Sequence, residues 1–223
     1  MTQSAQILSV QVGKPQTLAA VEEGGKPWRS AIYKTSVDGP VWARALGLDG
    51  DAQADHRHHG GEAQAINVYP AEHYEVWRAT PGLEAMTGGA FGENFTTLGM
   101  SEHTTFLGDV MRVGEAVVQV TQPRGPCYKL NRRWNNPDLQ SRAEQEYRFG
   151  WYLRVMEEGR VQAGDRFELL DRPHPDWSIA RVWDVTTGEL DTPETVADAR
   201  ALMDIALLGK NWRRALEHML KNP

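Results

Sequence analysis

The sequence predicts a mainly β fold with some α-helix, in which a β-barrel or sandwich precedes a small helical unit. Over the first two thirds of the chain, short β-rich runs are separated by turns, several of them Gly-Asp, as is typical of antiparallel barrels. The C-terminal part instead contains helix caps and a one-sided apolar stripe. The 223 residues suit one large domain with an appendage, so we expect a β-barrel domain over 1–172 and a helical unit over 173–223.

Six β-rich segments support the barrel. They span residues 5–12, 30–37, 41–46, 65–69, 110–120 and 166–170. The fifth is divided at Gly114-Glu115, which predicts a turn between two strands. Pro70 at the first position and Glu72 in the first turn predict a helix over 70–78. A further helix is expected over 141–157, with an interruption near Gly150.

Capping signals define the helical unit. Thr192 is a suitable N-cap, with Pro193 at the first helical position, so a helix is predicted from there to Leu208. Asn211 is expected to cap a second helix. Its apolar residues recur on one face, namely Trp212, Ala215, Leu216, Met219 and Leu220. Two prolines, Pro173 and Pro175, predict a stiff linker before the unit.

The composition excludes several classes of protein. Lys and Arg number 24 and Asp and Glu number 30, so the net charge is −6, which disfavours a duplex nucleic-acid binder. The single cysteine, Cys127, rules out an intramolecular disulfide and a Cys-rich zinc site, and it suits a reducing compartment such as the cytoplasm. No segment resembles a secretory signal or reaches the ~20 apolar residues of a membrane span, so we expect no membrane association.

Cys127 lies in the segment QPRGPCYK, which is the strongest candidate for chemistry. Pro123 and Pro126 restrict the backbone, and Arg124 and Lys129 bring positive charge near the thiol. Nearby cations favour the thiolate, which is the form that binds metals and attacks electrophiles. The segment directly follows a predicted strand, where functional residues are common. The alternative, a buried structural cysteine, stays open on these local features.

Three other segments contain candidate ligand-binding residues. In DHRHHGG, residues 55–61, His56, His58 and His59 precede two glycines. This pattern fits a solvated histidine cluster, a metal site, or a loop whose backbone approaches a ligand. GGAFGEN, residues 88–94, is either a simple glycine turn or a nest of backbone N–H groups beside Asn94. In KPWRSAIYK, residues 26–34, Ser30 and Lys34 would share a strand face toward an anion, or the segment is a charged edge strand.

The order of these segments resembles the MOSC family, whose domain is named after the C-terminal part of molybdenum cofactor sulfurase. The resemblance rests on SAIYK, LGLDGDAQADHRHHGG, YPAEHYEVW, GAFGEN and the run from GD through MRVGEAVVQVTQPRGPCYKL. It is dense from Ser30 to Leu130 and weaker to Leu170, and the order and intervals are most similar to the bacterial YiiM-type members. The histidine tract is longer here than in the family pattern, and Gly125 occupies a variable position; neither alters the cysteine.

The resemblance implies a β-barrel domain with a three-helix C-terminal unit. It also implies a molybdopterin-bound molybdenum cofactor, with Cys127 as the protein ligand to the metal. The family's histidine, asparagine and arginine positions fall on His59, Asn94 and Arg124. We expect Ser30, Lys34, Asn94, Arg124 and Lys129 to bind the cofactor, because Arg and Lys can offset its negative charge. His59 is the expected proton donor or substrate contact.

The activity implied by the resemblance is reduction of N-hydroxylated compounds, such as 6-N-hydroxylaminopurine, to amines. Electrons would come from a partner flavoprotein reductase, and the cofactor would provide the difficult step. An alternative is a non-catalytic molybdenum cofactor carrier or sulfur-handling protein, and a nucleic-acid-binding module is a third. The sequence leaves open the physiological substrate, the proton donor, any metal on the His56–His59 tract, and whether a strand edge or the helical tail forms a homodimer.

Overall fold

The computed structural model describes residues 5–20, 26–55 and 59–221 and confirms the mainly β fold with helices. Within these residues, one curled sheet of eight strands has the order β13-β9-β10-β11-β7-β8-β1-β4. Its strands are β1 Gln6–Val12, β4 Thr35–Ser36, β7 Ile66–Pro70, β8 Phe95–Leu98, β9 Val110–Val113, β10 Ala116–Pro123, β11 Trp151–Glu157 and β13 Phe167–Asp171. Two smaller sheets pair β2 Gln16–Leu18 with β3 Trp28–Ser30, and β5 Val41–Arg44 with β6 Gly47–Leu48 and β12 Gly159–Val161.

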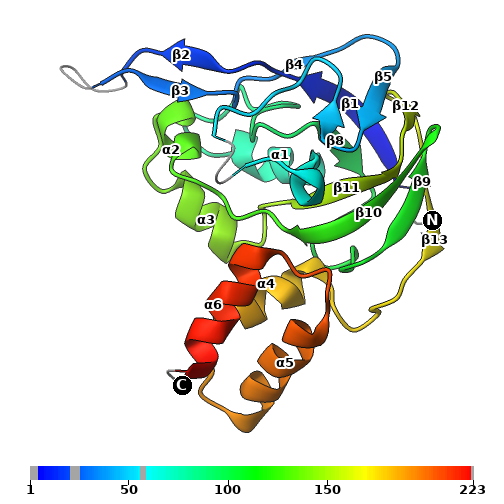
Figure 1. The fold of residues 1–223 in the computed structure, drawn as a ribbon. Coiled ribbons are helices and arrows are strands. Elements are labelled where there is room, and N and C mark those ends of the chain that lie inside the picture. Colours follow the sequence, from blue (N-terminus) through cyan, green and yellow to red (C-terminus); the bar gives the residue numbers. More distant parts are fainter. Residues whose placement is uncertain (1–4, 21–25, 56–58, 222–223) are drawn as a thin grey trace.

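The large sheet curls until its ends meet (Figure 1). Neighbouring strands are antiparallel except β7 and β8, which are parallel. The first half of β1 returns to the segment before β13, where the Ile7 N–H donates to the Asp165 carbonyl at 2.9 Å and the Gly164 N–H donates to the Ile7 carbonyl at 2.8 Å. These bonds bring the two sides of the sheet together around one core, which reduces its exposed edge.

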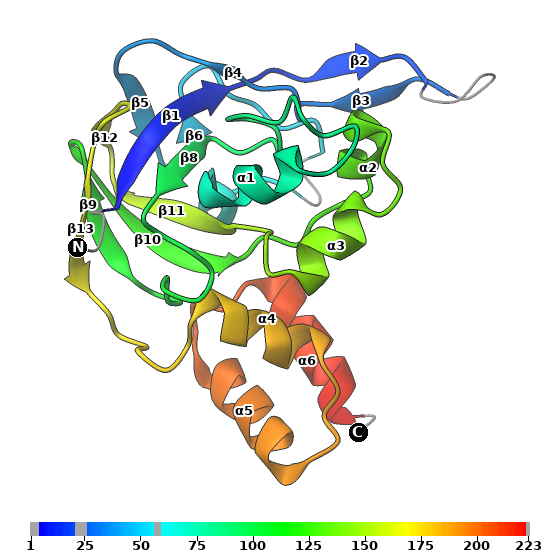
Figure 2. The same ribbon diagram turned by 180° about the vertical axis from the view of Figure 1, so that it is seen from behind.

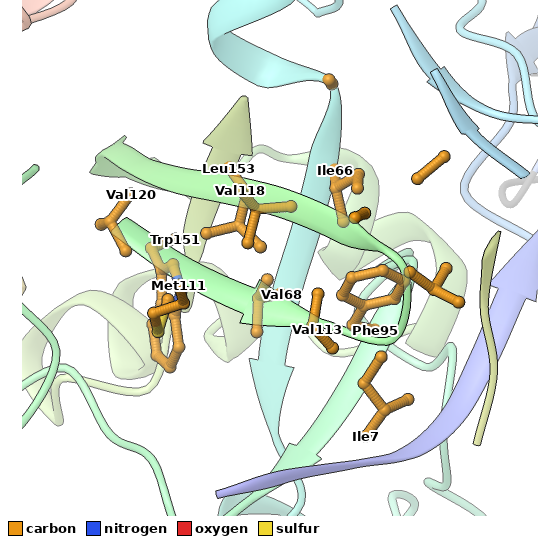
Figure 3. Close-up of a cluster of buried hydrophobic side chains, with 14 of the residues drawn as sticks. Ile7, Ile66, Val68, Phe95, Met111, Val113, Val118, Val120, Trp151 and Leu153 are labelled. Atoms are coloured by element: carbon orange, nitrogen blue, oxygen red, sulfur yellow. The ribbon is translucent and has the colours of Figure 1, made fainter. Parts of the chain in front are cut away.

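Apolar side chains of the strands fill the inside of the curled sheet (Figure 3). Trp151 on β11 and Phe95 on β8 are fully buried there, together with valines and isoleucines of β7, β9 and β10. Close packing of this kind fixes where each strand ends. The loops that follow β8, β10 and β11 therefore start from rigid positions.

The helices form two groups, one packed beside the curled sheet and a second, C-terminal group that projects away from it (Figures 1 and 2). The first group is α1 Glu72–Arg78, α2 Lys129–Trp134 and α3 Leu139–Gln145, which share an aromatic core with Tyr69 and Phe91. The second group is α4 Ile179–Thr187, α5 Pro193–Asp204 and α6 Lys210–Lys221, which have their own apolar core. Thr192 caps α5 as predicted, in a reciprocal capping box with Thr195.

The connection into the C-terminal helices is fixed to the barrel. Arg172 donates two hydrogen bonds of 2.8 Å to the buried carboxylate of Asp109, and the Leu107 N–H donates to the Trp177 carbonyl at 2.8 Å. The stiff linker predicted from the prolines is therefore held by side-chain and backbone bonds as well. The division at residues 172 and 173 stays a prediction about independent folding units.

Most predicted elements are confirmed, but two are wrong. Residues 30–37 do not form one strand, since β3 ends at Ser30, β4 begins at Thr35, and 31–34 are irregular backbone. Residues 141–157 do not form a broken helix, because α3 ends at Gln145 and β11 starts at Trp151. Tertiary pairing decides the second case, because the β-branched and aromatic run after Gly150 lies between β7 and β10. Pro70 ends β7 instead of opening α1. Asn211 lies inside α6 instead of capping it, and α5 ends at Asp204 instead of Leu208. The sequence predicts no separate helix over α4.

Gly150 is the residue on which the entry into β11 depends. Its φ is +76°, and a Cβ there would lie 2.1 Å from the Val68 carbonyl oxygen. We expect Gly150→Ala to lower the free energy of unfolding by about 3 kcal/mol or more, from backbone strain plus overpacking. Gly82→Ala is the matched control, because Gly82 has φ +84° with nothing within 4 Å of its Cβ position. Equal denaturant midpoints for the two variants would contradict the packing argument.

Candidate active site

One pocket opens beside the barrel and gathers the residues singled out from the sequence. The space within it and at its open mouth amounts to about 630 Å³. Its wall includes all seven predicted site residues, namely Ser30, Lys34, His59, Asn94, Arg124, Cys127 and Lys129. These residues come from segments far apart in the sequence, so only the fold brings them together. Their chemical roles stay predictions.

A buried carboxylate, Asp51, joins three segments at the pocket wall. It pairs with the Nζ of Lys34, and only 7% of the Lys34 side chain and 1% of the Asp51 side chain are exposed. It also accepts hydrogen bonds from Asn94 Nδ2 at 2.9 Å and from the Gly13 N–H at 2.8 Å. Burial lowers the pKa of Lys34, and the charge of Asp51 opposes that shift. The charge of Lys34 is therefore largely balanced within the protein.

Asn94 connects strands around the pocket. Its Oδ1 accepts from the Asn67 N–H at 3.1 Å, and its Nδ2 donates to the Gln11 carbonyl at 3.2 Å as well as to Asp51. Both ends of the side-chain amide are thus occupied by the protein. This geometry suits a residue that positions the wall, in contrast to the direct cofactor contact expected from the resemblance.

The glycine-rich segment 88–94 is organised by Glu93, which is fully buried. The carboxylate accepts from the Gly89 N–H at 2.6 Å and from the Phe91 N–H at 3.1 Å, and it also accepts from the Tyr74 hydroxyl. Two of the backbone N–H groups that could have formed an anion nest are thus used by Glu93. The nest interpretation is wrong for those groups, and the loop instead serves as a rigid wall.

Arg133 on α2 ties that wall to the irregular segment 31–34. Its Nη1 donates to the Ile32 carbonyl at 2.5 Å and to the Gly89 carbonyl at 2.6 Å. Close approach of the two segments needs Gly92, because a Cβ there would lie 2.9 Å from Ile32 Cγ1. Arg133 thereby explains why residues 31–34 leave the strand geometry predicted for them.

The cysteine segment starts where β10 ends. The Arg124 N–H donates to the Gly150 carbonyl at 3.1 Å, and its Nη2 donates to the Phe91 carbonyl at 2.8 Å. Arg124 is 6% exposed, and its Nη1 is buried without a hydrogen-bond partner among the described residues. Cys127 is half-buried on the pocket wall, just before α2. A buried guanidinium with an unused donor fits an anionic group bound in this pocket.

The pocket wall also contains residues that the sequence analysis did not single out. Asp51, Asn67 and Tyr152 all lie on its wall, and Asn67 Oδ1 is buried without a hydrogen-bond partner among the described residues. Burial raises the pKa of the Tyr152 hydroxyl, and the charge of Arg124 opposes that shift. Asp51 follows Gly50 and resembles an ordinary turn residue. Its pairing with Lys34, 17 positions away, has no local sequence signal.

The predicted histidine tract falls mostly outside the described residues, since His56 and His58 are not among them. His59 is on the pocket wall, and its N–H donates to the Asp55 carbonyl at 2.9 Å. Over residues 5–20, 26–55 and 59–221, no group of three or more His, Cys, Asp or Glu could hold a metal ion. Over the same ranges, no helix is long and apolar enough to cross a membrane.

Comparison with known proteins places this chain in a family. The MOSC domain model matches residues 55–168, which is half of the chain and includes the glycine loop and the cysteine segment. The chain belongs to the MOSC family. Within the family it resembles the protein YiiM of Escherichia coli, with 38% identity over 200 residues that cover 86% of this chain and 84% of the relative.

Two further comparisons find similar proteins. The crystal structure of YiiM from Geobacillus stearothermophilus has a TM-score of 0.79 and 35% identity, and the match covers 97% of this chain and 99% of that one. The YiiM-like fold is therefore confirmed. A protein named reductase from Gibberella moniliformis is 39% identical over 179 residues, which cover 76% of this chain but only 32% of the fungal protein.

Replacing Arg133 tests whether its hydrogen bonds hold two segments of the pocket wall in place. We expect Arg133→Gln to speed amide hydrogen exchange in residues 31–34 and 88–92 about tenfold, because two charge-assisted bonds to their carbonyls are lost. Exchange mass spectrometry measures this directly. The control is Arg132→Gln, the exposed neighbour whose guanidinium lies 5.1 Å from the Tyr128 ring centroid. The same exchange rates in both variants would contradict the assigned role.

Proposed function

We propose that this protein is a molybdenum cofactor-dependent reductase of N-hydroxylated compounds, such as 6-N-hydroxylaminopurine. The observation that carries the proposal is the position of Cys127, the chain's only thiol, on the wall of a pocket that also holds a buried arginine with an unused donor. Membership of the MOSC family and the likeness to a fungal protein named reductase support an oxidoreductase.

Cys127 is the proposed protein ligand to molybdenum. A thiolate is a soft donor suited to a redox-active metal, and Cys127 is accessible from the pocket instead of being sealed in a core. The proline-framed segment and its bond from Arg124 to Gly150 restrict the loop, so the sulfur is positioned before the cofactor binds. The structural-cysteine alternative has less support, because the side chain lies at a cavity.

The cationic side of the pocket is proposed to hold the anionic parts of the cofactor. Nη1 of Arg124 has no hydrogen-bond partner among the described residues, and Lys129, two residues after Cys127, is the first residue of α2. A guanidinium in a fixed position binds phosphate or dithiolene charge strongly. Ser30 also lines the wall, but its Oγ accepts from the Ile32 N–H at 3.2 Å, so it remains a weaker candidate contact.

The remaining wall is proposed to bind the substrate. His59 lines the pocket, and an imidazole is a side chain suited to donate a proton or to contact a substrate. When bound, the molybdenum cofactor supplies the two electrons that break the N–O bond. The protein orients the substrate, excludes bulk water and delivers protons. We propose a flavoprotein reductase as the electron donor.

Replacing the thiol tests the proposal most directly. Cys127→Ser is expected to lower the molybdenum content of protein from molybdate-replete cells and to reduce turnover of N-hydroxylaminopurine at least about 100-fold, because a hydroxyl is a poor ligand for this metal. Elemental analysis and amine formation with a reduced flavoprotein or artificial donor measure both effects. The control is Tyr128→Phe, the exposed neighbouring residue, which keeps the thiol.

Two results would contradict the reductase. The first is normal turnover by Cys127→Ser. The second is wild-type protein with full molybdenum that reduces no N-hydroxylated substrate, which would favour the alternative of a cofactor carrier or sulfur-handling protein. Strong, salt-sensitive duplex binding would instead favour a nucleic-acid-binding module.

Arg124 provides a separate test of cofactor binding. Arg124→Met is expected to weaken retention of the cofactor about tenfold in dialysis, the loss of roughly one charge-assisted hydrogen bond. The matched control is Arg29→Met on β3, because Arg29 is exposed and outside the pocket wall. Unchanged retention in Arg124→Met would show that its unused donor does not face the cofactor.

A further inference from the structure

We infer that Lys34 is the proton donor to the leaving oxygen of the substrate, and that Asp51 positions it. The inference rests on the reductase proposed above. It changes the role expected for Lys34, from an anchor that offsets cofactor charge to an acid in the reaction.

The geometry of the pair supports a donor. Lys34 and Asp51 both line the pocket, and their side chains are almost completely buried. An ammonium group has three N–H donors, and Asp51 is the one side-chain partner that the described residues provide for Nζ. The remaining donors are therefore available to a ligand in the pocket.

Charge balance argues against the role of cofactor anchor. Asp51 and Lys34 together are neutral, so the pair contributes little net positive charge to an anionic cofactor. Arg124 has no comparable carboxylate partner among the described residues: its N–H and Nη2 donate to backbone carbonyls, and its side chain also interacts with the Tyr152 hydroxyl. Arg124 is therefore suited to binding an anion. Lys34, in contrast, is held by a fixed carboxylate and is suited to donating a proton.

Asp51 is itself held in place. Besides Lys34, it accepts from Asn94 and from the Gly13 N–H, so its two oxygens are fixed by three donors from three segments. A carboxylate fixed in this way sets the position of Nζ without moving during a reaction. Asp51 is therefore a positioning residue.

The chemistry balances with one proton from Lys34. Reduction of a hydroxylamine to an amine breaks the N–O bond, consumes two electrons from the flavoprotein donor and consumes two protons. Lys34 protonates the departing oxygen, which leaves as water, while the nitrogen keeps the electron pair and takes the second proton from His59 or water. The neutral Lys34 amine regains its proton from water at the pocket mouth. General acids of this kind contribute about 10²-fold to 10⁴-fold in rate.

An ester of the same substrate separates proton donation by Lys34 from any other role of this residue in the pocket. The O-acetyl derivative of the hydroxylamine releases acetate, which leaves as an anion and needs no proton. We expect Lys34→Met to reduce the free hydroxylamine about 100-fold more slowly than wild type, with the ester reduced at a rate within about threefold of wild type. Molybdenum content is measured in parallel and is expected to be unchanged. Lys14→Met, at an exposed lysine, is the control.

Lys34→Met leaves Asp51 without its cation, which can destabilise the fold. The double variant Lys34→Met with Asp51→Asn removes that charge, and the same selective loss is expected in it. Equal losses for both substrates, or no loss for either, would overturn the inference while leaving the reductase intact. Wild-type protein with full molybdenum that reduces neither substrate would overturn the reductase and, with it, this inference.

Titration of Lys34 provides a readout that needs no cofactor. In the cofactor-free protein, the ¹³Cε signal of Lys34 is expected to titrate below the exposed lysines, because burial lowers its pKa. Asp51→Asn removes a charge that raises this pKa, so the titration should move to lower pH. Activity requires protonated Lys34, so the fall in turnover at high pH should move in the same direction. An unchanged titration and profile would contradict the positioning role.

Other groups near Lys34 must be considered in that titration. Glu93 also raises the pKa of Lys34 through its charge. The remaining charged or titratable groups on the pocket wall are Asp55, His59, Arg124, Cys127, Lys129 and Tyr152. Asp51→Asn leaves all of them in place, so a shift that follows this single change is assigned to the Lys34–Asp51 pair.

Discussion

The buried carboxylate of Asp51 is the interaction on which the pocket depends. Burying an ionised group is costly unless charge and hydrogen bonds compensate it, and here a lysine, an asparagine amide and a backbone N–H do so. Each of these donors belongs to a different segment of the chain. Satisfying one carboxylate therefore fixes the relative positions of the strand β1, the irregular segment 31–34 and the start of β8.

The same principle organises the neighbouring walls. Glu93 accepts from two N–H groups of the glycine loop, and Arg133 donates to one carbonyl of that loop and one of segment 31–34. Irregular backbone near a pocket cannot satisfy itself as a strand does, so buried side chains must provide partners. The MOSC pocket is thus built from loops whose shape is specified by charged residues behind them, and this leaves the thiol and Arg124 facing the cavity.

The residues expected from the family pattern differ in how far the protein itself occupies their side chains. Cys127 and Arg124 line the pocket, and Nη1 of Arg124 has no hydrogen-bond partner among the described residues. Asn94 and Lys34, in contrast, have partners within the protein, and their proposed contribution lies in positioning and in proton transfer. A motif identifies which residues matter, whereas the hydrogen bonds around each side chain restrict what it can do there.

The sequence by itself determined several barrel strands flanked by Gly-Asp turns, the Thr192 cap and the cysteine segment, because these depend on local backbone preferences and on motif order. It could not determine β11, since the run after Gly150 becomes a strand only between β7 and β10. Nor could it identify Asp51, because a turn aspartate becomes a shared hydrogen-bond acceptor only when the fold brings donors from distant segments to it. Long-range pairing and burial decided these features, and neither leaves a signal in neighbouring residues.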